Sequence, residues 1–222
     1  MQCCLALKLF LEFAVSEQRQ PQSFLISEKD YLQLRGGDAK PRKKAVLSDQ
    51  QMLELIRLLP DHWANAVKIC RVFGVRPWEI GSIDRRINLG GEPQLFVTKG
   101  KTVTSRSGVK EETEPRWLEA VAIDGSTFGL VETWASLQLP ETVSGANLGA
   151  RLRRLPYWNQ LVQDFAANGE WLRPYSFRDT FSVRAHDLGI SSTNIAQAMG
   201  HSVEVHHRSY SCLLYTSDAA DE

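Results

Sequence analysis

Residues 175–210 read YSFRDTFSVRAHDLGISSTNIAQAMGHSVEVHHRSY, and this stretch decides how the rest of the chain is interpreted. The apolar residues of its first half recur at helical spacing and stop at Gly189, which predicts a helix with a glycine C-cap. The segment after Gly189 predicts a second, shorter helix that ends at Gly200. We therefore expect two helices, each closed by a glycine, followed by a polar segment that leads to Tyr210.

Polar residues that suit phosphate chemistry stand at the ends of predicted elements, both in this stretch and upstream of it. Arginine suits a phosphate because its planar fork offers parallel donors and stays charged. Taken singly, each residue has an ordinary structural role, such as a surface salt bridge, a helix cap or an aromatic anchor. Taken together, they predict a set of side chains that converges on one phosphate. The set consists of Arg76, Lys99, Lys101, Arg178, His201 and Tyr210.

The rest of the chain predicts an α+β, mostly helical fold with a small three-stranded antiparallel sheet. Residues 1–34 predict helical material that is broken at Pro21, and a glycine-containing basic linker follows over residues 35–46. Ser48 then opens a new unit, because it stands three residues before Gln51 in the pattern of a capping box.

Short strands are predicted in the middle of this new unit. Two of them, around residues 86–91 and 94–100, are joined by a Gly-Gly turn, and the third is predicted within residues 101–112. Helices are predicted again over residues 130–137 and 150–169. The order is therefore helices, a small sheet, then helices.

The composition is that of an ordinary soluble globular protein, with 43% hydrophobic and 23% charged residues among 222. The formal charge is zero, but Arg42, Lys43 and Lys44 belong to a basic run that predicts a DNA-facing patch; a solvated face is the alternative. The four cysteines form no Cys-x-x-Cys pair, which favours a reduced, cytosolic protein. Lys8 and Glu12 interrupt the apolar start, so we expect an amphipathic helix there.

Two segments resemble the tyrosine recombinases, the family of the phage integrases and Cre-like enzymes. GVRPWEI, residues 74–80, is similar to the family's first arginine box, usually Gly-x-Arg-x-x-Glu-Leu, with Ile80 in place of the leucine. Residues 175–210 are similar to the second box, in which an arginine, a Gly-His pair and a tyrosine nine residues after the histidine keep this order. The resemblance covers residues 47–210 and implies the DNA breaking-rejoining catalytic core of that family.

The resemblance implies a site-specific recombinase or integrase that needs neither a metal nor a nucleotide cofactor. Tyr210 is expected to attack the scissile DNA phosphate and to leave a 3′-phosphotyrosyl link. Arg76 and Arg178 are expected to hold the nonbridging oxygens, and His201 to donate a further hydrogen bond to the same phosphate. Lys101 is expected to protonate the leaving 5′-oxygen.

Two assignments stay open at this point. Lys99 is the alternative to Lys101 as the general acid, and it is also a candidate DNA contact. Tyr175 occupies the position of the family's usual histidine, three residues before Arg178. A neutral imidazole accepts a proton near pH 7 more readily than a phenol does. The chain is thus either an active recombinase or a catalytically impaired DNA-binding relative, with a helical interaction protein as a remoter alternative.

The two ends of the chain are interpreted separately. Residues 1–34 are expected to be the C-terminal remnant of an N-terminal, helical DNA-binding domain. Residues 211–222 contain CLLYTSDAADE, which resembles translated sequencing adapter and is expected to be non-native, so Tyr215 receives no role. His206 and His207 are adjacent, which does not suit a zinc site. A prokaryotic or phage protein that assembles as a homotetramer on double-stranded DNA in the cytoplasm is expected.

Overall fold

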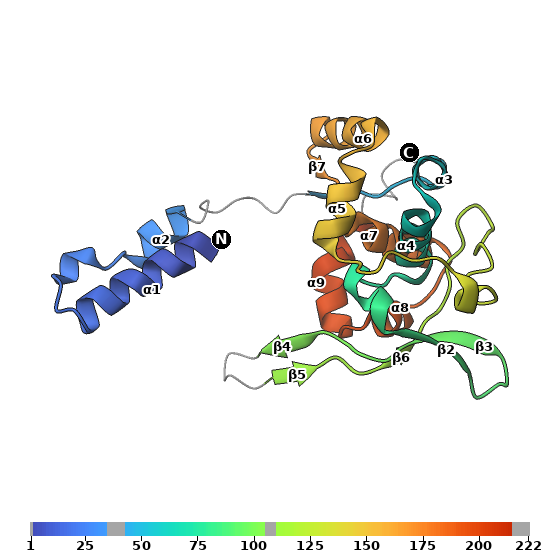
Figure 1. Cartoon of the computed structure of the whole chain (residues 1–222), viewed down its shortest axis with the longest axis horizontal. Helices are drawn as coiled ribbons and strands as arrows, with labels where there is room; N and C mark the ends of the chain where they lie inside the picture. Colours follow the sequence, from blue (N-terminus) through green and yellow to red (C-terminus); the bar gives the residue numbers. More distant parts are fainter. Residues whose placement is uncertain (1, 35–42, 105–109, 215–222) are drawn as a thin grey trace. The chain divides into compact units, whose positions relative to one another are not determined.

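The structure is a computed structural model that describes residues 2–34, 43–104 and 110–214. The chain divides into two compact units, Met1–Arg42 and Lys43–Glu222 (Figure 1). Residues 43–46, which the sequence analysis placed in the linker, therefore lie in the second unit. No helix within the described ranges is long and apolar enough to cross a membrane.

The first unit is a small helical hairpin with little buried surface. It consists of α1 (Gln2–Ser16), the 3-10 turn η1 (Gln22–Phe24) and α2 (Glu28–Leu34). Lys8 joins the two helices, because its Nζ lies 2.6 Å from Glu28 Oε1 and 4.8 Å from the centre of the Tyr31 ring. Phe10 and Phe13 remain exposed.

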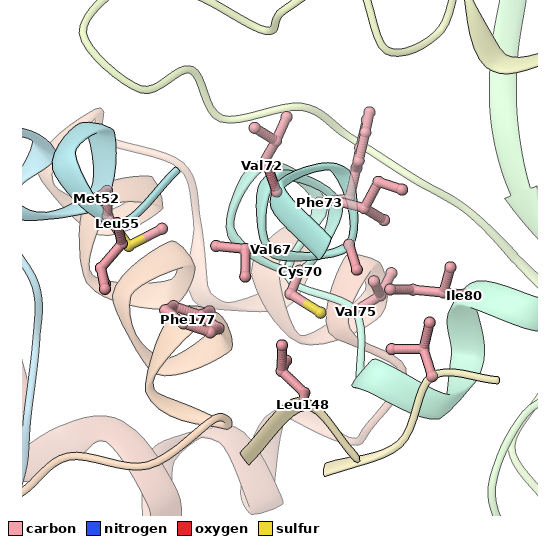
Figure 2. Packing of buried hydrophobic residues seen from close by; sticks show 14 of the residues in the cluster. Met52, Leu55, Val67, Cys70, Val72, Phe73, Val75, Ile80, Leu148 and Phe177 are labelled. Atoms are coloured by element: carbon pink, nitrogen blue, oxygen red, sulfur yellow. The ribbon is translucent and has the colours of Figure 1, made fainter. Parts of the chain in front are cut away.

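The second unit is built around α4, whose apolar side chains are buried by the helices around it. Figure 2 shows Val67 and Cys70 of α4 facing Phe177 of α7, with Leu55 of α3 and Leu148 of α5 in the same cluster. The helices of this unit are α3 (Asp49–Leu58), α4 (Asp61–Phe73), α5 (Gly145–Leu152), α6 (Pro156–Ala167), α7 (Ser176–Asp187), α8 (Ser192–Met199) and α9 (Val203–Leu214), with 3-10 turns η2 (Pro77–Ser82) and η3 (Trp134–Ser136).

Local capping explains where α3 begins and where α4 ends. The predicted capping box is present at α3: Gln51 N donates to Ser48 Oγ at 3.1 Å, and Ser48 N donates to Gln51 Oε1 at 2.9 Å. α4 ends at Gly74, which has a φ of 61° and lies directly against the Phe181 ring, so a side chain has neither the conformation nor the space there. This close approach seats α7 against the end of α4.

The predicted three-stranded antiparallel sheet is present, in the order β2-β3-β6, and it lies beside the helices (Figure 1). Ile83 pairs with Val97 and Val97 with Arg116, which fixes the register of all three strands. A separate parallel pair joins the start of the unit to the segment before α7. The strands are β1 (Lys43–Lys44), β2 (Ile83–Ile87), β3 (Pro93–Val97), β4 (Thr102–Thr104), β5 (Lys110–Glu112), β6 (Arg116–Trp117) and β7 (Glu170–Trp171).

Two predictions about individual elements were wrong, and in a third, residues 150–169, a break between α5 and α6 interrupts the predicted helical stretch. The third strand of the sheet is β6 and not a strand within residues 101–112, because Thr104 pairs with Lys110 and that segment folds back on itself as β4 and β5. Residues 130–137 form turns and the short η3 instead of a helix. Most backbone hydrogen bonds in this segment join residues three apart, as in a 3-10 turn. The β-branched residues Val131 and Thr133 have low helix propensity, so they do little to extend the turn into an α-helix.

Candidate active site

Arg178 lies in the first turn of α7 and joins the ends of two other helices. Its Nη1 donates to Gly74 O after α4, and its Nη2 donates to Met199 O in the last turn of α8 at 2.5 Å. The side chain is 4% exposed, and this burial lowers the pKa of the guanidinium to about 10. Arg178 therefore still carries its charge at pH 7, inside the protein and in a fixed position.

Arg76 is held by the glutamate three residues after it. Its Nη1 donates to Glu79 Oε1 at 2.8 Å, and its backbone N donates to Glu79 Oε2 at 2.7 Å. Pro77 opens η2 directly after Arg76, which fixes the backbone between them. The second guanidinium nitrogen of Arg76, Nη2, donates to Gly200 O at 3.3 Å. Both predicted arginines thus meet at the end of α8.

A third arginine, Arg116 on β6, lies at the same place and was missed in the sequence analysis. Its Nε donates to Ala198 O at 2.7 Å, and its Nη2 donates to Glu79 Oε2 at 3.0 Å. Burial by itself raises the pKa of Glu79, but Arg116 and Arg76 outweigh it and hold that pKa below its usual value. The signal that was available is the strand alternation, which puts Arg116 on the same buried face as Leu118.

These three residues, Arg76, Arg116 and Arg178, form what we call the arginine cluster. They donate to three successive carbonyl groups at the end of α8, those of Ala198, Met199 and Gly200. The last carbonyls of a helix have no partner within the helix and carry partial negative charge, so cations are favourable there. The cluster therefore organises the segment that leads into His201.

His201 follows directly after α8 and faces the cluster. Its Nδ1 lies 3.2 Å from Ser202 O. Because a carbonyl oxygen only accepts, Nδ1 carries the hydrogen in this contact. Its Nε2 is buried and has no hydrogen-bond partner among the described residues. Burial, followed by the charge of Arg178, lowers the pKa of His201 to about 4, so the ring is neutral at pH 7 and Nε2 offers a lone pair.

Tyr210 lies on α9 and is 6% exposed, with its ring against a row of histidines. The ring centroids of His206 and His201 lie 4.8 Å and 6.0 Å from that of Tyr210, in stacked arrangements. His206 in turn has its Nε2 2.9 Å from His186 Nε2 on α7. Burial raises the pKa of Tyr210 to about 12, although the nearby Arg178 opposes this shift.

The basic residues predicted to face DNA have different positions. Lys44 lies against the predicted nucleophile: its Nζ is 3.9 Å from the centre of the Tyr210 ring and donates to Ser209 O at 2.8 Å. Lys43 pairs with Glu170 at 2.8 Å and is largely exposed. Arg42 lies outside the described residues.

The predicted lysines stand apart from the arginine cluster. Lys99 and Lys101 flank Gly100 in what we call the lysine turn, and both side chains are exposed. The backbone of the turn is fixed, because Lys101 N donates to Thr113 Oγ1 at 2.6 Å and Thr113 N donates to Lys101 O at 3.0 Å. Within the described parts of the chain, neither ammonium makes a hydrogen bond or an ion pair with the cluster.

Tyr175 lies half-buried at the N-cap of α7. Its ring packs beside Gly145 of α5, where an added Cβ would lie 3.1 Å from it, and near Arg173. The residue therefore contributes its ring to packing and its carbonyl oxygen to the first turn of α7. The predicted residues that the structure does bring together are Arg76, Arg178, His201 and Tyr210. The described residues contain no group of three potential metal ligands.

Comparison with known proteins places this arrangement in a known fold. No protein-family model matches the chain. A curated relative, Excisase A of Nostoc sp. strain PCC 7120, is 28% identical over 154 residues, which cover 67% of this chain and 30% of that protein. The match thus spans less than a third of the relative's length.

Among solved structures, the Tn1549 transposon integrase in complex with circular intermediate DNA is similar over 93% of this chain and 73% of that chain, with a TM-score of 0.52 and 16% identity. The same integrase in complex with transposon right end DNA gives a TM-score of 0.52 and 17% identity over 93% and 72% of the two chains. The predicted fold, the catalytic core fold of the tyrosine recombinases, is confirmed by these similarities.

Proposed function

We propose that this chain belongs to the tyrosine recombinase family and cuts and rejoins double-stranded DNA through a 3′-phosphotyrosyl intermediate. The observation that carries the proposal is the convergence of Arg76, Arg178 and His201 at the end of α8, with Tyr210 packed beside them. Support comes from the similar integrase structures, which were solved with DNA, and from a relative named as an excisase.

The arginines supply the charge for this reaction. The scissile phosphate would receive hydrogen bonds from Arg76 and Arg178, and Arg178 remains charged at pH 7 although it is almost fully buried. Fixed donors that face the developing charge stabilise a transition state strongly, because they need no rearrangement during the reaction. We propose that neither a metal nor a nucleotide is required, since the phosphotyrosyl ester keeps the bond energy for rejoining.

The contact between His201 and Ser202 suggests where the proton of Tyr210 goes. With hydrogen on Nδ1, the neutral His201 ring presents an acceptor at Nε2. The phenolic oxygen forms its bond to phosphorus while its proton passes to this nitrogen, and the bond to the 5′-oxygen breaks. The imidazolium then donates to the phosphate. A bound phosphate favours this step, because its negative charge raises the pKa of His201 from the low value it has in the free protein.

The leaving 5′-oxygen needs a proton, which we assign to the ammonium of Lys101, with Lys99 as the alternative. Rejoining reverses each step: the 5′-hydroxyl attacks, returns its proton to the lysine, and Tyr210 leaves. We further propose assembly as a homotetramer on the DNA, an assignment of residues 1–34 to a DNA-binding helical domain, and contacts of Lys43 with DNA phosphates outside the active site.

A covalent selection tests the function without knowledge of the DNA target. The protein is incubated with a pool of nicked duplexes whose central segment is randomised, and DNA that stays attached after denaturation is sequenced. We expect one family of sequences, with the tyrosine attached to a 3′-phosphate at a fixed position. Tyr210→Phe should retain no DNA, whereas Tyr215→Phe should retain as much as the original chain.

Retention by Tyr210→Phe would assign the nucleophile to another residue. Salt-dependent DNA binding with no covalent product, in the original chain, would support the catalytically impaired relative instead. Absence of any binding at low salt would remove DNA as the substrate.

A further inference from the structure

Arg116 is a buried arginine that neither motif of the sequence includes. Its Nε and Nη2 each donate a hydrogen bond, to Ala198 O and to Glu79 Oε2. Because the guanidinium is planar, these two bonds also fix the direction of its third nitrogen, Nη1. This nitrogen is buried and has no hydrogen-bond partner in the described part of the chain. A buried, charged donor without an acceptor is unfavourable, and a bound anion relieves it.

The unpartnered nitrogen lies where the other candidate groups meet. A Cβ added to Gly200 would lie 2.7 Å from Arg116 Nη1, so this nitrogen stands against the backbone of Gly200. Arg76 Nη2 donates to the carbonyl oxygen of the same residue. The next residue, His201, carries another buried nitrogen, Nε2, that has no hydrogen-bond partner among the described residues. The unpartnered nitrogen of Arg116 on β6 therefore lies against Gly200, the residue directly before His201 at the end of α8.

The charge of the site also favours a third arginine. When a phenolic oxygen attacks a phosphodiester and loses its proton, the transition state carries one more negative charge than the diester. Arg76 and Arg178 set against Glu79 leave one net positive charge, whereas adding Arg116 leaves two. The larger value matches the transition state better than the ground state, which is the condition for a faster reaction.

We infer that Arg116 is a third phosphate-binding arginine, which contacts a nonbridging oxygen of the scissile phosphate through Nη1. The inference rests on the proposed function of the site. In this arrangement Glu79 anchors two phosphate-binding arginines at once, one on each of its carboxylate oxygens. Strand β6 thereby contributes directly to phosphate binding.

Removing the negative charge of the phosphate distinguishes a direct contact of Arg116 with the phosphate from a purely structural role. Covalent attachment is measured with the selected DNA, and with the same DNA carrying a methylphosphonate at the cut site, which lacks the negative charge. On ordinary DNA we expect Arg116→Ala to react about 10²–10³-fold more slowly, as for other oxyanion donors. On the methylphosphonate its rate should approach that of the original chain. Leu118→Ala, a buried change nearby, should be slowed equally on both substrates.

A second measurement does not depend on cleavage. Inorganic phosphate should raise the melting temperature of the original chain more than chloride does at equal ionic strength. This difference should shrink in Arg116→Lys and persist in the exposed control Arg86→Ala. Equal slowing of Arg116→Ala on both DNAs, or an unchanged phosphate effect, would overturn the inference. Absence of covalent product from the original chain would instead defeat the proposed function, and the phosphate effect would still decide whether Arg116 binds the anion.

Discussion

The arginine cluster and the lysine turn differ in how firmly the fold holds their side chains. Each guanidinium of the cluster donates to a carbonyl oxygen at the end of α8, and Arg116 and Arg178 are almost fully buried. The lysine turn is fixed through the backbone of Lys101 and Thr113, while the two ammonium groups extend into solvent. The groups that stabilise charge are thus in place before DNA binds, and the proposed proton donor is not.

This difference has a chemical basis. A charge-stabilising donor is most effective when it needs no rearrangement, so burial and fixed bonds suit it. A general acid must reach the leaving oxygen, which an exposed side chain without fixed bonds to the protein is free to do. We expect the side chain of Lys101 to become ordered only when DNA is bound.

The largest effect is expected from Lys101→Ala, which should slow covalent attachment by about 10²–10⁴-fold, as for other general acids. Its free energy of unfolding should change by no more than about 0.5 kcal/mol, since the side chain is exposed. Both quantities are measured on the same preparation, by a trapping time course and by urea unfolding. Loss of activity without loss of stability is what we expect for an exposed catalytic side chain in the lysine turn.

Lys99→Ala is the matched control, because it removes the neighbouring ammonium. DNA with sulfur in place of the 5′-bridging oxygen sharpens the test further, since a thiolate is a far better leaving group than an alkoxide and needs no proton. That DNA should restore the rate of Lys101→Ala. Restoration of Lys99→Ala instead would exchange the two assignments.

Within the candidate site, some residues could be predicted from the sequence and Arg116 could not. Arg76 precedes an opening proline, His201 follows a helix-ending glycine, and Arg178 lies in the first turn of α7, so local rules indicated these positions. Tyr210 lies within α9 and was predicted from its spacing to His201 in the family resemblance. Arg116 stands on a two-residue strand whose pairing with β3 depends on how the intervening segment folds. Long-range pairing of this kind is not encoded in any local pattern.

The dependence on long-range packing also explains two other differences between the prediction and the structure. Lys44 belongs to a basic run that resembles a solvent-facing patch, and only the packing of β1 near α7 and α9 brings it to the Tyr210 ring. The third strand was placed too early because alternation in residues 101–112 predicts a strand but not its partner. The fold class needed only the order of the elements, and that order was readable.

The second-largest effect is expected from Glu79→Ala, which removes the anchor of two arginines. Glu79 is fully buried and pairs with Arg76 at 2.8 Å and Arg116 at 3.0 Å. Removing one partner of a buried ion pair costs about 3–5 kcal/mol, because it leaves the other charge uncompensated. Urea unfolding measures this, with the exposed Glu92→Ala as control. A loss no larger than that of the control would show that the cluster does not depend on Glu79.

A smaller effect is expected from Lys44→Met, which keeps the aliphatic chain but removes the ammonium. The lost bond to Ser209 O and the lost ion pair with Asp179 at 3.4 Å should cost about 1–3 kcal/mol. Amide hydrogen exchange should rise chiefly in α9. Lys43→Met is the matched control, because its pair with Glu170 is more exposed than the pair of Lys44 with Asp179, and surface pairs contribute about 0–1 kcal/mol. Equal effects of the two variants would place the anchor of α9 elsewhere.

The acid dependence of stability also separates the buried site from the exposed turn. Burial lowers the pKa of His201 and of His206 to about 4, from an unperturbed value of 6.5. Both groups are almost entirely neutral in either state well above pH 6.5. Between pH 6.5 and pH 4 the unfolded chain takes up protons that the folded chain does not, so stability falls as the pH falls.

The groups that face these rings act in the same direction, because Arg178 on α7, His186 on α7 and His207 on α9 all disfavour a further positive charge on His206. Urea midpoints across this pH range should fall less steeply in His206→Phe, which keeps a flat ring against Tyr210. His62→Phe, at a histidine far along the chain from the site, should leave the slope as it is. An unchanged slope in His206→Phe would mean that its ring is protonated as easily in the folded chain as in the unfolded one. The buried stack would then be open to water, as the lysine turn is.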